Sequence, residues 1–212
     1  MKRIYILLFL FTVTITFSHA QKNKSLVSWN FYGQVNGGTD NLLPDDLNDG
    51  LTATGITKGA GMRNDVIKFA HYWGGRGSSI DKSGPQDAIA KNKFFSLSFT
   101  PKAGKSLSLS AIKPLKIRIF SVGPTNLLLQ YSLDGTLYKD ITTLTIERPK
   151  IFSDLELPGC DLSAIKELQQ VQAGTTVSFR LVPWGATTDN YSNLYLGSVN
   201  NGPSLVFVGS VK

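Results

Sequence analysis

Apolar and polar residues alternate in short segments along most of the chain, and Gly, Pro, Asn and Asp separate these segments. In residues 95–99, Phe-Ser-Leu-Ser-Phe, every second side chain is apolar, and residues 177–181, Val-Ser-Phe-Arg-Leu, repeat this period. Successive side chains of a β-strand point to opposite faces, so these segments predict half-buried strands with serine and arginine on the polar face. The pattern predicts strands over residues 26–32, 51–56, 66–73, 94–100, 106–112, 115–122, 127–133, 137–146, 151–157, 176–182, 191–198 and 204–211.

Turn-forming residues connect the predicted strands. Asp134-Gly135 lies between two of them and is typical of a tight β-hairpin. Only residues 163–171 carry apolar side chains at a helical spacing, whereas residues 33–49 and 74–92 are long and irregular. Together these features predict an all-β, jelly-roll-like β-sandwich of about ten to twelve strands with one short helix.

The beginning of the chain has the pattern of an export signal. Basic residues precede an apolar run over residues 4–17, and the small residues Ser18 and Ala20 suit a cleavage site. This run is too short to cross a bilayer, and no second apolar stretch reaches about 18 residues. We therefore expect a signal peptide over residues 1–20 and a single β-sandwich domain over residues 21–212. The product would be secreted or periplasmic, with no membrane insertion after signal removal.

Composition and charge restrict the partners. The chain is 42% hydrophobic and 17% charged, which excludes an intrinsically disordered protein. Its formal net charge is +7, but Lys and Arg are scattered, and an exported chain rarely meets nucleic acid. We therefore expect no nucleic-acid partner. The basic balance suits a glycan or another cell-surface polymer, including one that carries sulfate or uronic acid groups.

Few residues are available for familiar catalytic chemistry. His71 is the single histidine outside the signal, Cys160 is the single cysteine, and no Gly-x-Ser-x-Gly motif occurs. These counts disfavour nucleophilic hydrolysis and a zinc site, and three glutamates leave few acid pairs for a glycosidase. A polysaccharide lyase would draw on Arg118, Arg180, His71 and Tyr131. The sequence favours a non-catalytic protein and leaves a lyase or hydrolase on the same scaffold as the alternative.

A set of short motifs occurs in order along the chain. They are Trp29-Asn30-Phe31, the Gly-rich segment 55–61, residues 94–101, Ser121-Val122-Gly123-Pro124, residues 131–135 with Asp134-Gly135, residues 177–181, and Trp184-Gly185-Ala186. In this order they resemble a family of secreted, jelly-roll-like β-sandwich modules of Gram-negative bacteria. The resemblance covers nearly all of the chain after the signal. It implies an exported sandwich, and it brings no established activity and no assigned catalytic residues.

Aromatic side chains beside predicted loops indicate a ligand site. A pyranose ring has an apolar face that stacks on aromatic rings, and a few polar groups then determine its orientation. We expect a non-catalytic binding module, with carbohydrate as the favoured ligand. The residues expected to bind it are Trp184, Trp73, Tyr72, Arg76, Asp189 and Asn190. Because a tryptophan in a β-sandwich is often part of the core, burial of both indoles would refute this site.

Two further interpretations remain open. Asp and Asn side chains in residues 40–49 could supply oxygen ligands to calcium, and no other cofactor is expected. A surface or matrix adhesion domain is the alternative without a small ligand, and it would present a broad apolar patch and no groove.

Overall fold

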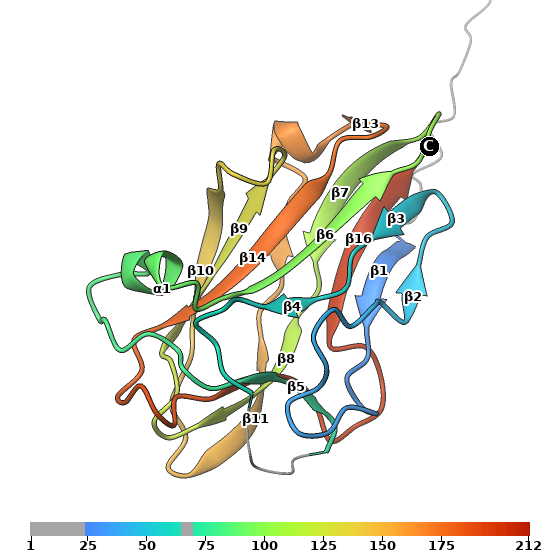
Figure 1. The fold of residues 1–212 in the computed structure, drawn as a ribbon. Helices are drawn as coiled ribbons and strands as arrows, with labels where there is room; N and C mark the ends of the chain where they lie inside the picture. The colour runs from blue at the N-terminus through green and yellow to red at the C-terminus, as the bar shows by residue number, and fades with distance from the viewer. Residues whose placement is uncertain (1–23, 65–69) are drawn as a thin grey trace, which may run out of the picture.

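The structure is a computed structural model that describes residues 24–64 and 70–212. The predicted signal peptide, residues 1–20, lies outside the described residues. Within them the chain forms sixteen strands, one α-helix and one short 3-10 helix (Figure 1). The strands are β1 (Lys24–Trp29), β2 (Asp46–Leu47), β3 (Leu51–Ala53), β4 (Thr57–Lys58), β5 (Tyr72–Gly75), β6 (Phe95–Pro101), β7 (Ser106–Ile112), β8 (Leu115–Phe120), β9 (Asn126–Ser132), β10 (Lys139–Thr145), β11 (Phe152–Leu157), β12 (Cys160–Asp161), β13 (Val171–Gln172), β14 (Val177–Trp184), β15 (Leu194–Gly197) and β16 (Leu205–Val211). The helices are α1 (Gln86–Ala90) and η1 (Lys166–Leu168).

The strands pair into three antiparallel sheets. The first has the order β12-β7-β16-β1-β2, and β13 also pairs with β7. The second has the order β10-β9-β14-β6-β3, and β4 also pairs with β6. The third has the order β11-β8-β15-β5. Figure 1 shows β10, β9, β14 and β6 of the second sheet side by side across the molecule.

The hydrophobic core lies between the second sheet and the other two. In β6 the burial alternates strictly, so Phe95, Leu97 and Phe99 point inward while the intervening serines and threonine point outward. Phe99 meets Phe207 of the first sheet at 5.2 Å between ring centroids. Phe95 meets Trp73 of the third sheet at 5.1 Å. The all-β sandwich expected from the alternating pattern is therefore confirmed.

Each of the twelve predicted strands overlaps a strand of the structure. Half of the segment predicted over residues 66–73 lies outside the described residues, and its last two residues begin β5. The hairpin at Asp134-Gly135 joins β9 to β10, and Gly135 has a φ of 74°, which glycine adopts easily. The pattern missed β2, β4, β12 and β13, which have two residues each. Segments this short show no period.

The helix predicted over residues 163–171 is wrong. The structure has only the single turn η1 there, and β13 begins at Val171. Gln170 has a φ of 56°, in the left-handed region, which ends any right-handed helix before this point. The side chain of Gln169 donates instead to the backbone carbonyls of Leu109 and Leu162.

The α-helix of the structure lies in the stretch 74–92, which the pattern described as irregular. α1 has five residues, and an ion pair of 2.7 Å joins Asp87 to Lys91 one turn later. It packs Ala88 against Leu128 and Val182 on the outer face of the second sheet. No helix among the described residues is long and apolar enough to span a membrane.

Candidate binding groove

An open groove crosses the outer face of the second sheet. Its volume is about 350 Å³. Side chains from β6 and β14 form its floor, and the segment leading into β4 and the β9–β10 loop border it. The lining residues are Asn41, Thr54, Gly55, Thr57, Ser96, Leu97, Ser98, Tyr138 and Ser178.

Hydroxyl groups dominate the groove because every second residue of β6 is a serine that faces outward. Ser96 Oγ lies 2.9 Å from Thr57 Oγ1, and Ser98 Oγ lies 3.0 Å from Thr54 Oγ1. Ser178 lies directly across from Ser98 in the register of β14 with β6. A hydroxyl can donate one hydrogen bond and accept two, so these paired serines keep capacity for a ligand.

Arg180 and Tyr138 stand at one side of the groove. The guanidinium carbon of Arg180 lies 3.5 Å from the centroid of the Tyr138 ring and 4.4 Å from that of Phe94. Two aromatic rings therefore make cation–π contacts with the guanidinium. Arg180 lies across from Ser96 on one side and Gln130 on the other, which places it in the same outward-facing row as the groove floor.

Tyr138 and Arg180 form the wall of the groove. Two buried polar atoms beside this wall have no hydrogen-bond partner among the described residues. No described residue accepts a hydrogen bond from Arg180 Nε, and none donates one to Gln130 Oε1, although both atoms are buried. Gln130 Nε2 donates to Asp140 Oδ1 at 2.8 Å, which determines the orientation of the amide. A buried donor and acceptor without partners cost free energy, and a bound polar molecule or water would lower that cost.

The structure places two of the predicted ligand-binding residues away from any surface. Trp73 is 0% exposed, stacks against Phe31, and donates from Nε1 to the carbonyl of Thr39 at 2.7 Å. Tyr72 is 1% exposed. The expectation that Trp73 and Tyr72 stack on a ligand is therefore corrected. Trp73 faces the core because it alternates in β5 with Tyr72, which faces the opposite side of the third sheet.

Tyr72 instead belongs to a structural cluster. Its hydroxyl donates to Asp154 at 2.8 Å, and the guanidinium carbon of Arg118 lies 4.2 Å from its ring centroid. Arg118 also donates from Nε to Asp154 Oδ1 at 2.8 Å. Burial, followed by the hydrogen bond to Asp154, raises the pKa of Tyr72 well above its ordinary value. The ring is a buried part of the third sheet.

Trp184 is half-buried at the end of β14. It packs against the small cluster that α1 forms on the second sheet, and it does not line the groove. Arg63 links Asp189 and Arg76. Its backbone forms an antiparallel β-bridge with Arg76, and its side chain donates to the backbone carbonyl of Asp189 at 2.9 Å. Asn190 is exposed. The six predicted residues therefore do not form one platform.

The residues that line the groove were not selected from the sequence, and Arg180, which stands beside the groove, was considered only for a lyase. The signal was present in the serines of residues 95–99, because the pattern already placed their hydroxyls on the outer face. The aromatic wall was not detectable. Tyr138 belonged to the strand predicted over residues 137–146, whereas the structure places it in the hairpin loop just before β10. Only the pairing of β9 with β14 brings it to Arg180.

The residues considered for a lyase are distributed over separate contacts. His71 stacks on Tyr32 with ring centroids 4.0 Å apart. Tyr131 donates its hydroxyl to Glu167, and burial followed by this hydrogen bond raises the pKa of Tyr131 to about 12. Arg118 is engaged with Asp154. This arrangement does not bring the lyase candidates together at one bond.

The structure does not bring the carboxylates of residues 40–49 together as a set of calcium ligands. Asp40 contacts Lys58 Nζ at 3.3 Å, and Asp45 accepts the backbone N–H of Asn30 at 2.6 Å. Among the described residues, no group of three or more His, Cys, Asp or Glu is placed to hold a metal ion. Asp40 and Asp45 therefore serve separate local contacts.

The fold and the site define an antiparallel β-sandwich with a hydroxyl-lined groove on one outer face. No protein-family model matches the sequence, and no curated protein is significantly similar to it. Among solved structures, the chain is similar to a family 29 carbohydrate-binding module variant complexed with mannohexaose. The identity is 11% and the TM-score 0.36, over 88% of this chain and 92% of that chain.

Two further solved structures show weaker similarity. A family 29 carbohydrate-binding module has 11% identity and a TM-score of 0.34, over 88% of this chain and 89% of that chain. The C-terminal domain of a chitobiase from Bacteroides fragilis has 10% identity and a TM-score of 0.24, over 73% of this chain and 95% of that chain. Scores at this level do not establish a common fold or a common ligand. The function proposed below is therefore supported by the groove itself.

Proposed function

We propose that this chain is an exported, non-catalytic module that binds carbohydrate in the groove of the second sheet. The observation that carries the proposal is the combination of a hydroxyl-lined floor with the Tyr138–Arg180 wall. The predicted signal peptide supports export to the periplasm or the cell exterior. The ligand is a glycan or another cell-surface polymer.

The chemistry of the groove suits a sugar. A pyranose presents hydroxyls around its rim and C–H groups on its faces, so it needs many weak hydrogen-bonding partners and an aromatic ring. The hydrogen-bonding partners are Ser96, Ser98 and Ser178, and the aromatic ring is that of Tyr138. An open groove on a flat sheet also lets a polymer enter from the side without a free chain end.

The distribution of titratable groups supports binding without turnover. The carboxylate of Asp140, which lies across from Gln130 in the second sheet, accepts a hydrogen bond from Gln130. The lining residues contain no carboxylate and no histidine, which are the usual acids and bases of glycan cleavage. Binding by hydroxyls, an aromatic ring and a guanidinium needs none of them.

The test is a glycan-array screen followed by titration calorimetry on the purified chain, with product analysis of each glycan that binds. We expect a bound glycan that is recovered uncleaved. Tyr138→Ala removes the aromatic wall and is expected to weaken binding by about tenfold or more. Tyr191→Ala is the matched control, because Tyr191 is 62% exposed and does not line the groove.

Two results would overturn the proposal. If Tyr138→Ala binds the glycan as tightly as the wild type while remaining folded, the ligand does not use this groove. Release of shortened or unsaturated products would instead show an enzyme and favour the lyase or hydrolase alternative.

A further inference from the structure

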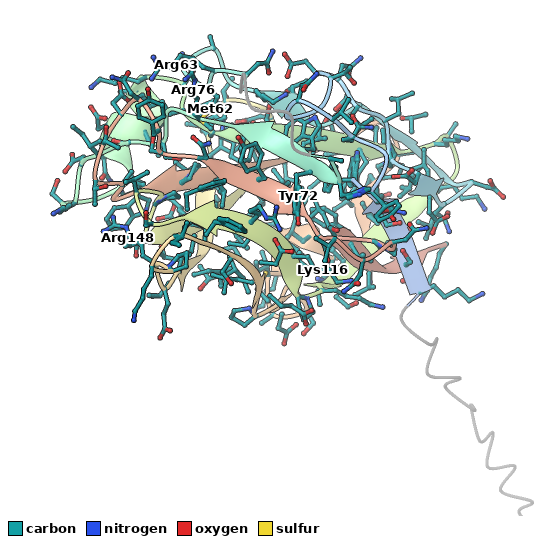
Figure 2. The ribbon with its side chains drawn as sticks, turned by 90° about the horizontal axis from the view of Figure 1, so that it is seen from below. Met62, Arg63, Tyr72, Arg76, Lys116 and Arg148 are labelled. Carbon is teal, nitrogen blue, oxygen red and sulfur yellow. The ribbon has the colours of Figure 1, made fainter. Side chains whose placement is uncertain are left out.

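Two arginines face each other at one corner of the sandwich, outside the groove. Arg63 N donates to Arg76 O at 2.8 Å, and Arg76 N donates to Arg63 O at 2.9 Å. Residues that exchange both backbone hydrogen bonds lie directly opposite, with their side chains on the same face. Figure 2 shows Arg63 and Arg76 close together at one edge of the molecule. Like charges in this arrangement repel each other.

In the part of the chain that the structure describes, Asp189 is the carboxylate that offsets charge at this corner. Asp189 contacts Lys93 Nζ through Oδ1, and its Oδ2 lies 3.8 Å from Arg63 Nη2. No carboxylate of the described residues lies within ion-pair distance of Arg76. Among the described residues, the corner therefore brings the cations Arg63, Arg76 and Lys93 near the carboxylate of Asp189.

Arg76 also lacks a polar partner for part of its guanidinium. Its Nε is buried, and none of the described residues accepts a hydrogen bond from it. A buried charged donor without an acceptor is costly, because water has been removed and nothing replaces it. Arg76 as a whole residue is only half-buried, so an oxyanion from solution that binds its exposed part would reduce the repulsion between the two arginines.

The position of Arg63 is determined by its surroundings. Arg63 Nη2 donates to the backbone carbonyl of Asp189 at 2.9 Å. Gly77 has a φ of 102°, and a Cβ there would lie 3.7 Å from Arg63 Nε. The positive φ favours glycine here, and 3.7 Å is an ordinary contact distance, so residue 77 lies beside this guanidinium. The side chain of Arg63 remains 46% exposed, so an ion in solution can reach it.

We propose that Arg63 and Arg76 form an oxyanion site that binds the carboxylate or sulfate groups of an acidic polysaccharide. A planar guanidinium donates two parallel hydrogen bonds to the oxygens of such a group. Both arginines lie outside the groove lining, so the site makes a second contact with the polymer. The identification of the ligand as a polysaccharide depends on the proposed function. Oxyanion binding depends only on the arrangement of Arg63 and Arg76.

The experiment measures binding of trigalacturonate, a heparin-derived hexasaccharide, sodium sulfate and a neutral oligosaccharide to the full chain by NMR. Arginine Nε–Hε resonances are the readout. We expect the Arg76 resonance to shift with the oxyanion probes and not with the neutral sugar. Comparison of trigalacturonate with sodium sulfate distinguishes carboxylate from sulfate recognition, because the heparin fragment carries both groups.

Arg76→Gln is expected to weaken binding of the better acidic probe by about tenfold or more, because a charge-assisted hydrogen bond is lost. Lys116→Gln removes the same charge and is the matched control. Figure 2 shows Lys116 toward the opposite edge of the molecule from Arg76. The affinity of the Lys116→Gln variant for the same acidic probe is expected to remain within about twofold of the wild type.

Folding of Arg76→Gln is checked by thermal unfolding, and Arg63→Gln provides a second, independent variant. Removal of one of two facing cations is expected to leave the melting temperature unchanged or to raise it. Equal loss of binding in Arg76→Gln and Lys116→Gln would show only a general charge effect and would overturn the site. No shift of the Arg76 resonance with any oxyanion probe would overturn it as well.

The same experiment distinguishes failure of this site from failure of the proposed function. Tyr138→Ala is expected to lose the glycan found in the array screen while the sulfate shift at Arg76 persists. If no glycan binds but that shift is present, the corner is an anion site and the proposed function fails. If a glycan binds through the groove and Arg76 does not respond, only the corner fails.

Discussion

The guanidinium of Arg180 contacts two aromatic rings, with its carbon 3.5 Å from the centroid of Tyr138 and 4.4 Å from that of Phe94. Three separate parts of the chain meet in this stack, namely β14, the β9–β10 hairpin and the start of β6. The stack holds a charged planar group on the outer face of the sheet, beside a row of serine hydroxyls. It is the feature that distinguishes this face from an ordinary solvated sheet.

Arg180→Lys is expected to weaken binding of the glycan by about tenfold while the protein stays folded. Lysine retains the charge but has no planar group to lie between Tyr138 and Phe94, and it directs its hydrogen bonds differently. Titration calorimetry on the wild type and the variant checks this. Unchanged affinity would mean that the guanidinium does not take part in the groove.

Trp73→Ala is expected to destabilise the protein by about 3–5 kcal/mol, because it removes a fully buried indole between Phe31 and Phe95 and leaves a cavity. Tyr191→Ala, at an exposed position, is expected to change stability by less than about 0.5 kcal/mol. Urea unfolding of both variants is the measurement. A Trp73→Ala protein as stable as the control would contradict the placement of this side chain.

Asp134→Asn is expected to reduce the loss of stability in acid. The carboxylate of Asp134 accepts backbone N–H groups of Leu137 and Thr136, which lowers its pKa well below the ordinary value near 3.8. A depressed pKa in the folded state gives stability that is present above pH of about 4 and is lost as the pH falls below it.

Thermal unfolding of the wild type and Asp134→Asn between neutral pH and pH 2 measures this contribution. The two melting curves are expected to differ most at neutral pH and to converge in acid. A difference that stays constant across this range would show that the hairpin carboxylate is not the source. Asp161→Asn provides a comparison in a different loop, because hydrogen bonds from Ser163 lower the pKa of Asp161 in the wild type.

Cys160 is expected to react slowly with thiol reagents in the folded protein. Burial raises the pKa of its thiol, which decreases the fraction of reactive thiolate at neutral pH. Alkylation by iodoacetamide, with and without denaturant, is the measurement. A rate that does not increase on unfolding would contradict the burial of this thiol.

Several features of the fold were predictable because they depend on neighbours in the sequence. The alternation of apolar and polar residues over residues 95–99 predicts which side chains face the core. This prediction does not depend on which strand pairs with the segment. The Asp134-Gly135 turn is likewise local. The predicted helix was wrong because Gln170 adopts a left-handed conformation, which the apolar spacing of residues 163–171 does not reveal.

The binding surface depends on residues that are distant in the sequence. Thr57, Ser96 and Ser178 meet only because β6 pairs with β4 on one side and with β14 on the other. A shift of one residue in either register would turn those side chains to the opposite face. Arg63 and Arg76 are likewise placed opposite each other by a single backbone bridge.

The sequence by itself therefore determined the class of fold and the two faces of each main strand, since period-two alternation is a property of the strand alone. Only the tertiary structure decided that Trp73 is core, that Tyr138 and Arg180 stack, and that the serine rows align into a groove. These outcomes follow from strand pairing and register, which arise from long-range packing and leave no local pattern in the chain.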